Sequence, residues 1–178
     1  IAYELCRPCD VYAMWFVKNM AIRLSRVVLR CFPILLAAAF LPAPFNITLP
    51  PGWLSGVLFL ASVTFGFLVL ISFSMLIYIS AFYTISPMGI RILATSVIEF
   101  FAGAIIPIPF FPEALQPILY ALPFASMQNT PFLIYTGHIS GFEAWRSIAV
   151  QLVWLAALMI AGRILMKRAL KKVIVQGG

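Results

Sequence analysis

The sequence predicts an all-α fold, a polytopic membrane helix bundle of about four spans with a cytosolic amphipathic helix and a re-entrant outer helix pair. Of its 178 residues, 63% are hydrophobic and only 10% are charged, and the mean hydropathy is +1.07. Soluble domains are about 45–50% apolar and about 25% charged. The stretch 31–90 contains no Lys, Arg, Asp or Glu, which leaves room for two spans of roughly 20 residues each.

The first predicted element is an amphipathic helix that begins at Asp10 and lies along the inner membrane surface. Asp10 is a suitable N-cap, and Pro8 just before it prevents the helix from extending backward. One polar stripe recurs at steps of four, three and four residues, at Asn19, Arg23, Arg26 and Arg30. A basic stripe of this kind faces headgroups and cytosol, so we assign residues 1–26 to a cytosolic coupling and amphipathic region.

The remaining residues, 27–178, are predicted to form the transmembrane bundle. Four apolar segments predict its spans, at about 27–42, 53–83, 92–111 and 145–166. The second of these carries no charge and is longer than a perpendicular span needs, so it tilts or projects beyond the bilayer. Prolines and glycines between the segments mark the turns.

The basic residues predict the orientation. Of the 12 Lys and Arg residues, all but Arg146 flank the spans on one side, and cytoplasmic flanks are the ones rich in Lys and Arg. We therefore expect a multi-pass protein of the inner cell membrane, with both ends of this sequence cytoplasmic. The net charge of +7 then reflects topology and contact with anionic lipid, and we expect no nucleic-acid partner.

Residues 112–141 are predicted to form the re-entrant outer segment, with short helices at about 113–122 and 125–136. The run 107–141 is apolar but contains six prolines. Non-helical backbone at membrane depth survives only where protein or a water-filled cavity satisfies its polar groups. An outer loop with short interfacial helices is the alternative, and the apolar composition favours the re-entrant form.

Glu99 is the sharpest candidate for a functional side chain. It lies about eight residues, or roughly 12 Å, into its predicted span. A carboxylate at that depth costs several kcal/mol unless it is paired, protonated or hydrated. Two interpretations stay open: Glu99 lines a water-filled pathway or gate, or it makes a structural hydrogen bond or a salt bridge to Arg30 or Arg91.

The C-x-x-C pair at Cys6 and Cys9 does not complete a redox or metal site. A thioredoxin-like centre needs a βαβ unit, which this sequence lacks, and a structural zinc site needs four ligands. Cys31 begins a predicted span, and the only histidine, His138, is predicted on the opposite side of the membrane. We expect no metal, no cofactor and no catalytic residue in this chain.

Two motifs stand out in this order of elements: Y-E-L-x-R-P-x-D at residues 3–10 and G-x-x-I-P-x-x-F-F-P at residues 103–112. Two predicted spans lie between these motifs, and a final span with a basic tail follows them. This arrangement resembles the permease subunits of ATP-binding-cassette (ABC) exporters of the six-helix, type-2 kind. The resemblance covers nearly the whole chain. It implies that the visible spans are spans three to six and that N-terminal spans precede this sequence.

The resemblance also implies roles for particular residues. A coupling helix docks on the ATPase subunit, and the residues in or beside it are Glu4, Arg7, Pro8, Asp10, Tyr12 and Trp15. The translocation pathway or gate includes Glu99, Gly103 and Pro107. The implied partners are a cytosolic ABC ATPase subunit that hydrolyses ATP, a second permease subunit and membrane lipid. The homodimer of permeases and the export direction rest on the resemblance alone.

Two other classes of protein fit this sequence less well. A polytopic membrane enzyme or scaffold without an ATPase partner is the alternative, and a cassette ATPase encoded beside this chain would discriminate against it. A channel requires a polar or charged ring along its spans, and one intramembrane acid fits that poorly. The substrate is open among hydrophobic or amphiphilic cations, lipids and polysaccharide-linked lipids.

Overall fold

The computed structural model of the chain describes residues 10–42, 49–84 and 87–171. Within these ranges every regular element is a helix, so the all-α prediction is confirmed. In chain order the elements are α2 (Val11–Ala39), α3 (Trp53–Ser80), α4 (Pro87–Phe101), the 3-10 helix η1 (Ile108–Phe110), α5 (Gln116–Ala121), α6 (Pro123–Met127), α7 (Asn129–Tyr135) and α8 (Gly141–Leu170).

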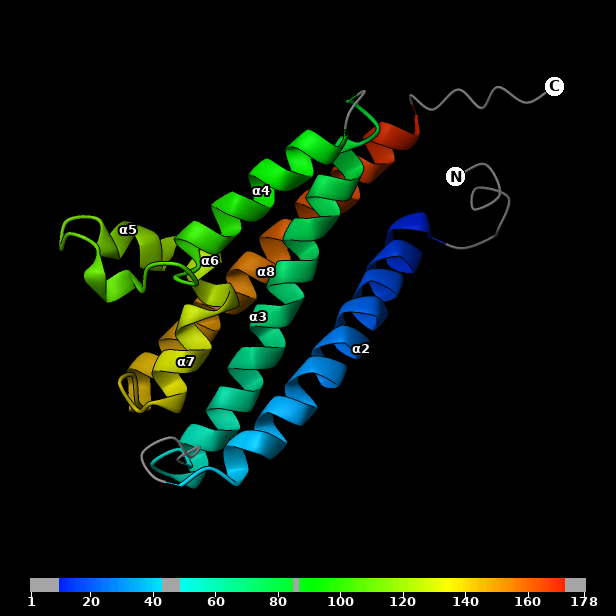
Figure 1. Ribbon diagram of the computed structural model, residues 1–178. Helices are drawn as coiled ribbons and strands as arrows, with labels where there is room; N and C mark the ends of the chain where they lie inside the picture. Colours follow the sequence, from blue (N-terminus) through cyan, green and yellow to red (C-terminus); the bar gives the residue numbers. More distant parts are fainter. Residues whose placement is uncertain (1–9, 43–48, 85–86, 172–178) are drawn as a thin grey trace.

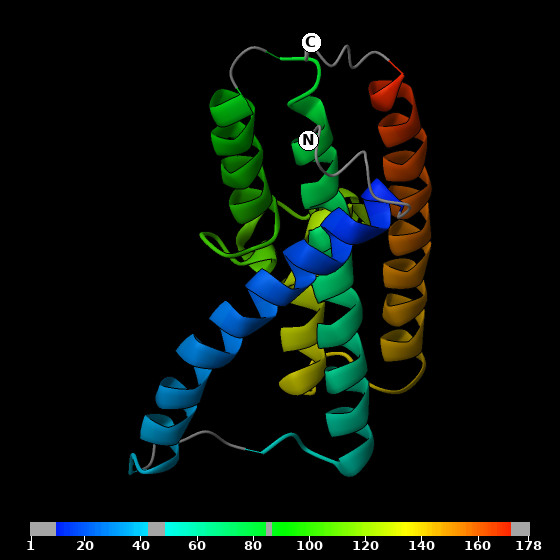
Figure 2. The same ribbon diagram turned by 90° about the vertical axis from the view of Figure 1, so that its right-hand side faces the viewer.

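Helices α3, α4 and α8 run along one common direction, α2 crosses them obliquely, and the short helices α5 to α7 lie beside them (Figures 1 and 2). Helices α3 and α8 are parallel to each other, whereas α2 and α4 run the opposite way (Figures 1 and 2). The start of α2, the end of α3, the start of α4 and the end of α8 therefore lie at one end of the molecule, which we call the basic end. Arg91 in the first turns of α4 belongs to it, as do Arg163 and Lys167 in the last turns of α8.

Helix α2 is continuous, whereas the sequence analysis divided it at residue 26. Asp10 is its N-cap, and its side chain accepts a hydrogen bond of 3.1 Å from the backbone N–H of Tyr12, as predicted. No Gly or turn residue interrupts the following stretch, and Pro33 lies inside the helix without ending it. Figure 2 shows α2 crossing α3 near its start and diverging from it toward Ala39.

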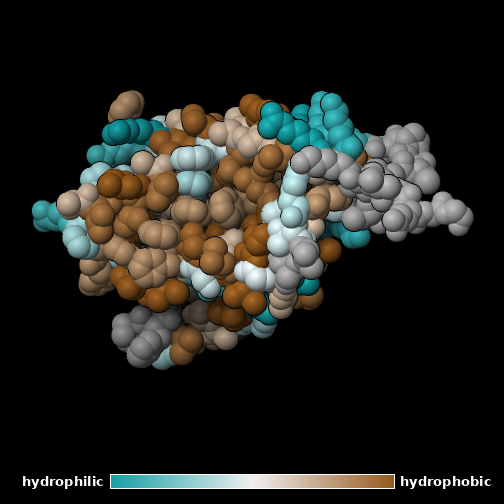
Figure 3. Space-filling view, turned by 90° about the horizontal axis from the view of Figure 1, so that it is seen from above, coloured by the Kyte–Doolittle hydropathy of each residue, from teal (hydrophilic) through white to brown (hydrophobic). Residues whose placement is uncertain are grey.

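Helices α3 and α8 are the two helices of the described ranges that are long and apolar enough to cross a membrane. They correspond to the predicted spans 53–83 and 145–166. Only 28% of the most apolar window of α3 and 22% of that of α8 is fully buried, so each helix keeps many apolar side chains partly or fully exposed. Figure 3, seen from the basic end, shows hydrophobic residues over much of that face, with hydrophilic groups mainly at its edges.

The predicted span 92–111 is wrong in its second half, because α4 ends at Phe101. Gly103 has φ = 81°, a left-handed conformation that glycine adopts without steric cost. Pro107 and Pro109 follow, and neither has the N–H group that a continuing helix needs. The 15 residues of α4 extend about 22 Å, less than the roughly 30 Å of a hydrocarbon core.

The segment between α4 and α8 contains three short α-helices where the sequence analysis placed two. The residue before Pro123, Leu122, is extended with φ = −74° and ψ = 153°, because a proline ring disfavours helical backbone at the preceding residue. Gln128, with φ = −136° and ψ = −50°, separates α6 from α7. The predicted helix 125–136 is therefore two helices with a break between them.

Three clusters of buried apolar side chains hold the helices together. The first joins α2, α3 and α8 at the basic end, the second joins α3, α7 and α8 at the other end, and the third lies within the broken segment. Their buried members are, in that order, Val11, Tyr12, Met75, Ile79, Met166 and Ala169; Leu58, Ile134, Ala144 and Ile148; and Ile108, Leu119 and Ala125.

A polar contact joins α3, α6 and α8 between the first two clusters. Gln151 of α8 is fully buried, and its Nε2 group donates to the carbonyl oxygen of Ser62 (3.1 Å), the hydroxyl of Ser62 (3.0 Å) and the carbonyl oxygen of Ser126 (2.8 Å). One turn further along α3, Gly66 allows the backbone of α6 to approach α3 closely. A Cβ atom there would lie 2.7 Å from the carbonyl oxygen of Ser126, so only glycine fits at this position.

The substitution Gly66→Ala tests this approach. The added methyl group would meet backbone atoms that cannot rotate away, so we expect a loss of about 1–3 kcal/mol in stability, the usual cost of overpacking. The matched control is Gly89→Ala in α4, where a Cβ atom would meet nothing within 4 Å. Thermal unfolding in detergent should separate the two variants, and equal midpoints would contradict the close packing of α6 on α3.

Candidate functional site

The residues predicted to lie at the ATPase contact fall into two groups. Glu4, Arg7 and Pro8, like Cys6 and Cys9, lie outside the described residues. Asp10, Tyr12 and Trp15 lie at and just after the start of α2, at the basic end of the bundle. The structure brings these three residues onto the ends of α3 and α8.

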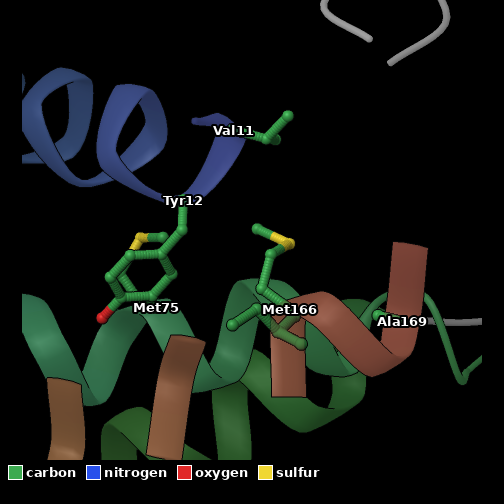
Figure 4. Packing of buried hydrophobic residues seen from close by; sticks show 6 residues of the cluster. Val11, Tyr12, Met75, Met166 and Ala169 are labelled. Atoms are coloured by element: carbon green, nitrogen blue, oxygen red, sulfur yellow. The ribbon is translucent and has the colours of Figure 1, made fainter. Parts of the chain in front are cut away.

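Tyr12 lies where α2, α3 and α8 meet (Figure 4). Its side chain is only 2% exposed and packs with Met75 of α3 and Met166 of α8. A Cβ atom on Gly162 would lie 2.8 Å from both the hydroxyl oxygen and Cε2 of Tyr12. The ring therefore contacts the backbone of α8 directly, at the one turn where glycine leaves room for it.

Two charged groups, Arg163 and Asp10, act on the ring of Tyr12. The guanidinium carbon of Arg163 lies 5.9 Å from the ring centroid of Tyr12, within cation–π range. Burial is the main effect on the phenol and raises its pKa, Arg163 opposes this, and the carboxylate of Asp10 adds to it. The hydroxyl of Tyr12 is buried and has no hydrogen-bond partner among the described residues.

A pocket of about 220 Å³ opens beside Tyr12, between the start of α2 and the last turns of α8. Its lining residues are Asp10, Tyr12, Arg163, Met166, Lys167 and Leu170. The pocket therefore offers one carboxylate and two cations to whatever binds at the basic end.

Trp15 connects the same part of α2 to the residues that follow α3. Its ring stacks on Phe82, with centroids 5.8 Å apart and an interplanar angle of 16°. Both side chains pack against the first cluster. The first two turns of α2 are thus attached to α3 through Tyr12 and Trp15 and to α8 through Tyr12.

Glu99 lies in the last turn of α4, and its side chain is exposed. Its backbone carbonyl accepts a hydrogen bond of 3.2 Å from the N–H of Ala104, which helps to close the helix. Among the described residues its carboxylate makes no ion pair with Arg30 or Arg91. The salt bridge that was one interpretation of Glu99 is therefore absent from the described part of the chain.

Gly103 and Pro107 lie in the turn that follows α4. A Cβ atom on Gly103 would lie 3.4 Å from Cγ1 of Ile108 and 3.5 Å from Oδ1 of Asn129, so this turn packs closely on the start of α7. Pro107 is exposed and precedes η1. The structure places Gly103 and Pro107 in one turn, whereas the side chain of Glu99 is directed outward from α4.

The family comparison identifies the class of the protein. A family model described as ABC-2 family transporter protein matches residues 1–177. The chain belongs to the ABC-2 family of transporters. No curated protein and no solved structure matches it. The ABC-2 chain is therefore the membrane permease component of an ABC transporter, which is not itself the catalytic subunit, and family membership implies an ABC ATPase as its partner.

Several contact residues of this ABC-2 permease were missed by the sequence analysis. Gln151 is a single amide within an apolar helix, which is a usable signal for a buried polar contact. Gly162 and Arg163 carried no such signal, because a glycine and a basic residue near the end of a span are common. Their importance follows only from the position of Tyr12 above them.

Two substitutions test the contact between Tyr12 and Gly162. We expect Gly162→Ala to lower the stability of the permease by about 1–3 kcal/mol, because the methyl group displaces the ring. Tyr12→Phe removes only a hydroxyl without a partner, so it should cost less than about 1 kcal/mol or stabilise the protein. Thermal unfolding of both variants in detergent measures this. A Tyr12→Phe variant as unstable as Gly162→Ala would mean that the hydroxyl has an essential partner.

Proposed function

We propose that the chain is the permease subunit of an ABC exporter in the inner cell membrane. It moves a hydrophobic or amphiphilic substrate with energy from ATP that a cytosolic ATPase subunit hydrolyses. The observation that carries this proposal is the packing of Tyr12 on Met75 and on the backbone of Gly162. Through it, a force applied to the start of α2 reaches both membrane-spanning candidates, α3 and α8.

The mechanism that follows is rigid-body coupling. Closure of the ATPase subunits on ATP moves residues 1–26, and the bundle changes between inward and outward access. Because Tyr12 and Trp15 are packed between the ends of helices, the start of α2 cannot move far without carrying the ends of α3 and α8 or unpacking the cluster. Closely packed side chains transmit displacements in this way because interiors are dense and hardly compressible.

The dimensions of α3 support the proposed membrane placement. Its 28 residues span about 42 Å, so a centred helix extends about 6 Å beyond each face of a roughly 30 Å core. Ser62 and Gly66 would then lie about 8 and 14 Å below the outer face. Ser126 of α6 lies against Gly66 and shares the amide group of Gln151 with Ser62. The broken segment would therefore be re-entrant, and we propose that the two ends of this sequence are cytoplasmic.

We further propose that two permease subunits enclose the pathway and that α4 and its following turn line it. The exposed carboxylate of Glu99 and the exposed side chains of Ile92 and Leu93 support this, since the described residues leave them uncovered. A carboxylate directed at lipid at this depth costs several kcal/mol, whereas one in a hydrated pathway does not. A single acid of this kind favours an amphiphilic cation as the substrate.

A charge exchange tests the proposed ATPase contact. We expect the double variant Arg7→Asp/Asp10→Arg to lower permease-dependent ATP hydrolysis in lipid discs about tenfold or more, because reversed charges at an interface repel their partners. The control Asp10→Asn keeps an N-cap side chain and removes only the charge, and Cys6→Ser/Cys9→Ser should be near wild type. Normal coupling in the charge-exchanged complex would remove residues 1–26 from the ATPase contact.

Cross-linking tests the proposed pathway. Single cysteines at Glu99 and Gly103, in a background where Cys6, Cys9 and Cys31 are all replaced by Ser, should form links between two permease copies that change when ATP is bound. The control is a cysteine at Val153, which is 67% exposed on α8 and should link in neither state. The absence of links from both test positions in every nucleotide state would contradict a pathway lined by this part of the chain.

A further inference from the structure

We infer that Arg23, in the seam between α2 and α3, binds the phosphate group of an anionic phospholipid of the inner leaflet. The side chain of Arg23 is half-buried and is held in place by two neighbours. Its Nε group donates to Oδ1 of Asn19 (2.9 Å), one turn earlier on α2. Its Nη2 group donates to the hydroxyl of Ser74 on α3 (2.8 Å). The guanidinium is therefore fixed in one orientation before any ligand arrives.

Both of these acceptors are neutral, so the positive charge of Arg23 is not balanced. The hydroxyl of Ser74 donates a hydrogen bond to the carbonyl oxygen of Leu70 (2.8 Å) and accepts one from Arg23. No carboxylate pairs with Arg23 among the described residues. Helix α2 contains no acidic residue, and its cations are Lys18, Arg23, Arg26 and Arg30.

The unused donors match a phosphate group. A guanidinium has five N–H groups, and the two bonds to Asn19 and Ser74 leave about three of them free. These donors form a planar fork that suits two oxygens of one phosphate. The amide nitrogen of Asn19, in a residue that is 8% exposed, also has no acceptor among the described residues. The seam thus holds several donors and no anionic acceptor.

The depth of the site favours a lipid over a soluble anion, and this step rests on the membrane placement proposed above. Ser74 lies six residues before the end of α3, or about 9 Å along the helix, which is about 3 Å inside the inner boundary of the core. A long arginine side chain at that level reaches the headgroups. The next turns of α2 expose Val27, Val28 and Leu29, so a lipid chain has an apolar surface below the guanidinium.

Lipid binding to the purified permease–ATPase complex tests this site. The complex is titrated with phosphatidylglycerol or phosphatidylcholine in detergent, and the lipids retained are counted by native mass spectrometry. We expect Arg23→Gln to weaken phosphatidylglycerol binding about tenfold, the loss of one charge-assisted contact. The matched control Arg26→Gln removes the same charge from an exposed position and should change binding less than about twofold.

Two more variants keep the test decisive if Arg23→Gln does not fold. Arg23→Lys keeps the charge but not the fork, and Ser74→Ala keeps the guanidinium but not its anchor; both should bind phosphatidylglycerol severalfold more weakly than wild type. Unchanged binding in both would overturn the site. Equal losses for Arg23→Gln and Arg26→Gln would also overturn it in favour of diffuse attraction.

Other occupants of the seam give distinct results. Displacement of phosphatidylglycerol by millimolar inorganic phosphate would overturn the lipid assignment in favour of a soluble anion. A zero-length carbodiimide cross-link from Arg23→Lys to a partner subunit would overturn it in favour of a protein carboxylate. Because lipid retention is measured without ATP or substrate, its failure would leave the exporter proposal standing, and a failure of coupling would leave the lipid site standing.

Discussion

The parallel contact between α3 and α8 is the interaction on which the other parts of the structure depend. Between apolar helices in a membrane the hydrophobic effect contributes little, so close packing and interhelical hydrogen bonds must hold them. Here the buried amide of Gln151 joins the two helices to α6. Each helix also contributes a glycine at a point of close approach, Gly66 on α3 and Gly162 on α8.

These two glycines contact different parts of the chain, at different positions along the α3–α8 pair. Gly66 admits the backbone of α6, which brings the broken segment deep into the bundle, and Gly162 admits the ring of Tyr12, which brings the start of α2 against the basic end. The proposed re-entrant segment and the proposed coupling region are therefore both built onto one helix pair. An ATPase-driven displacement at one level of this pair would be felt at the other through the length of two rigid helices.

The polar side chains in the bundle fall into two kinds. Gln151 has acceptors for its nitrogen on three oxygens, although its own Oε1 atom has no partner among the described residues. The protein itself uses the donors of Gln151, so the side chain joins helices and offers no donor to a ligand. Arg23 instead has a fixed orientation and unused donors, which is the arrangement of a binding group. The difference lies in how many donors the protein itself satisfies, which is why the proposed lipid site is placed at Arg23.

The sequence by itself determined the all-helical class, the apolar helices α3 and α8, the N-cap at Asp10 and the resemblance that family membership confirmed. These follow from composition, from charge and from backbone rules that act over a few residues. The same local rules apply to the end of α4 near Gly103 and to the break at Pro123, where a long apolar run favoured a continuous helix instead. Only the tertiary structure decided that Tyr12 lies on Gly162 and that Arg23 reaches Ser74. Those contacts join residues far apart in the chain, and they depend on how helix faces pack, which hydropathy does not encode.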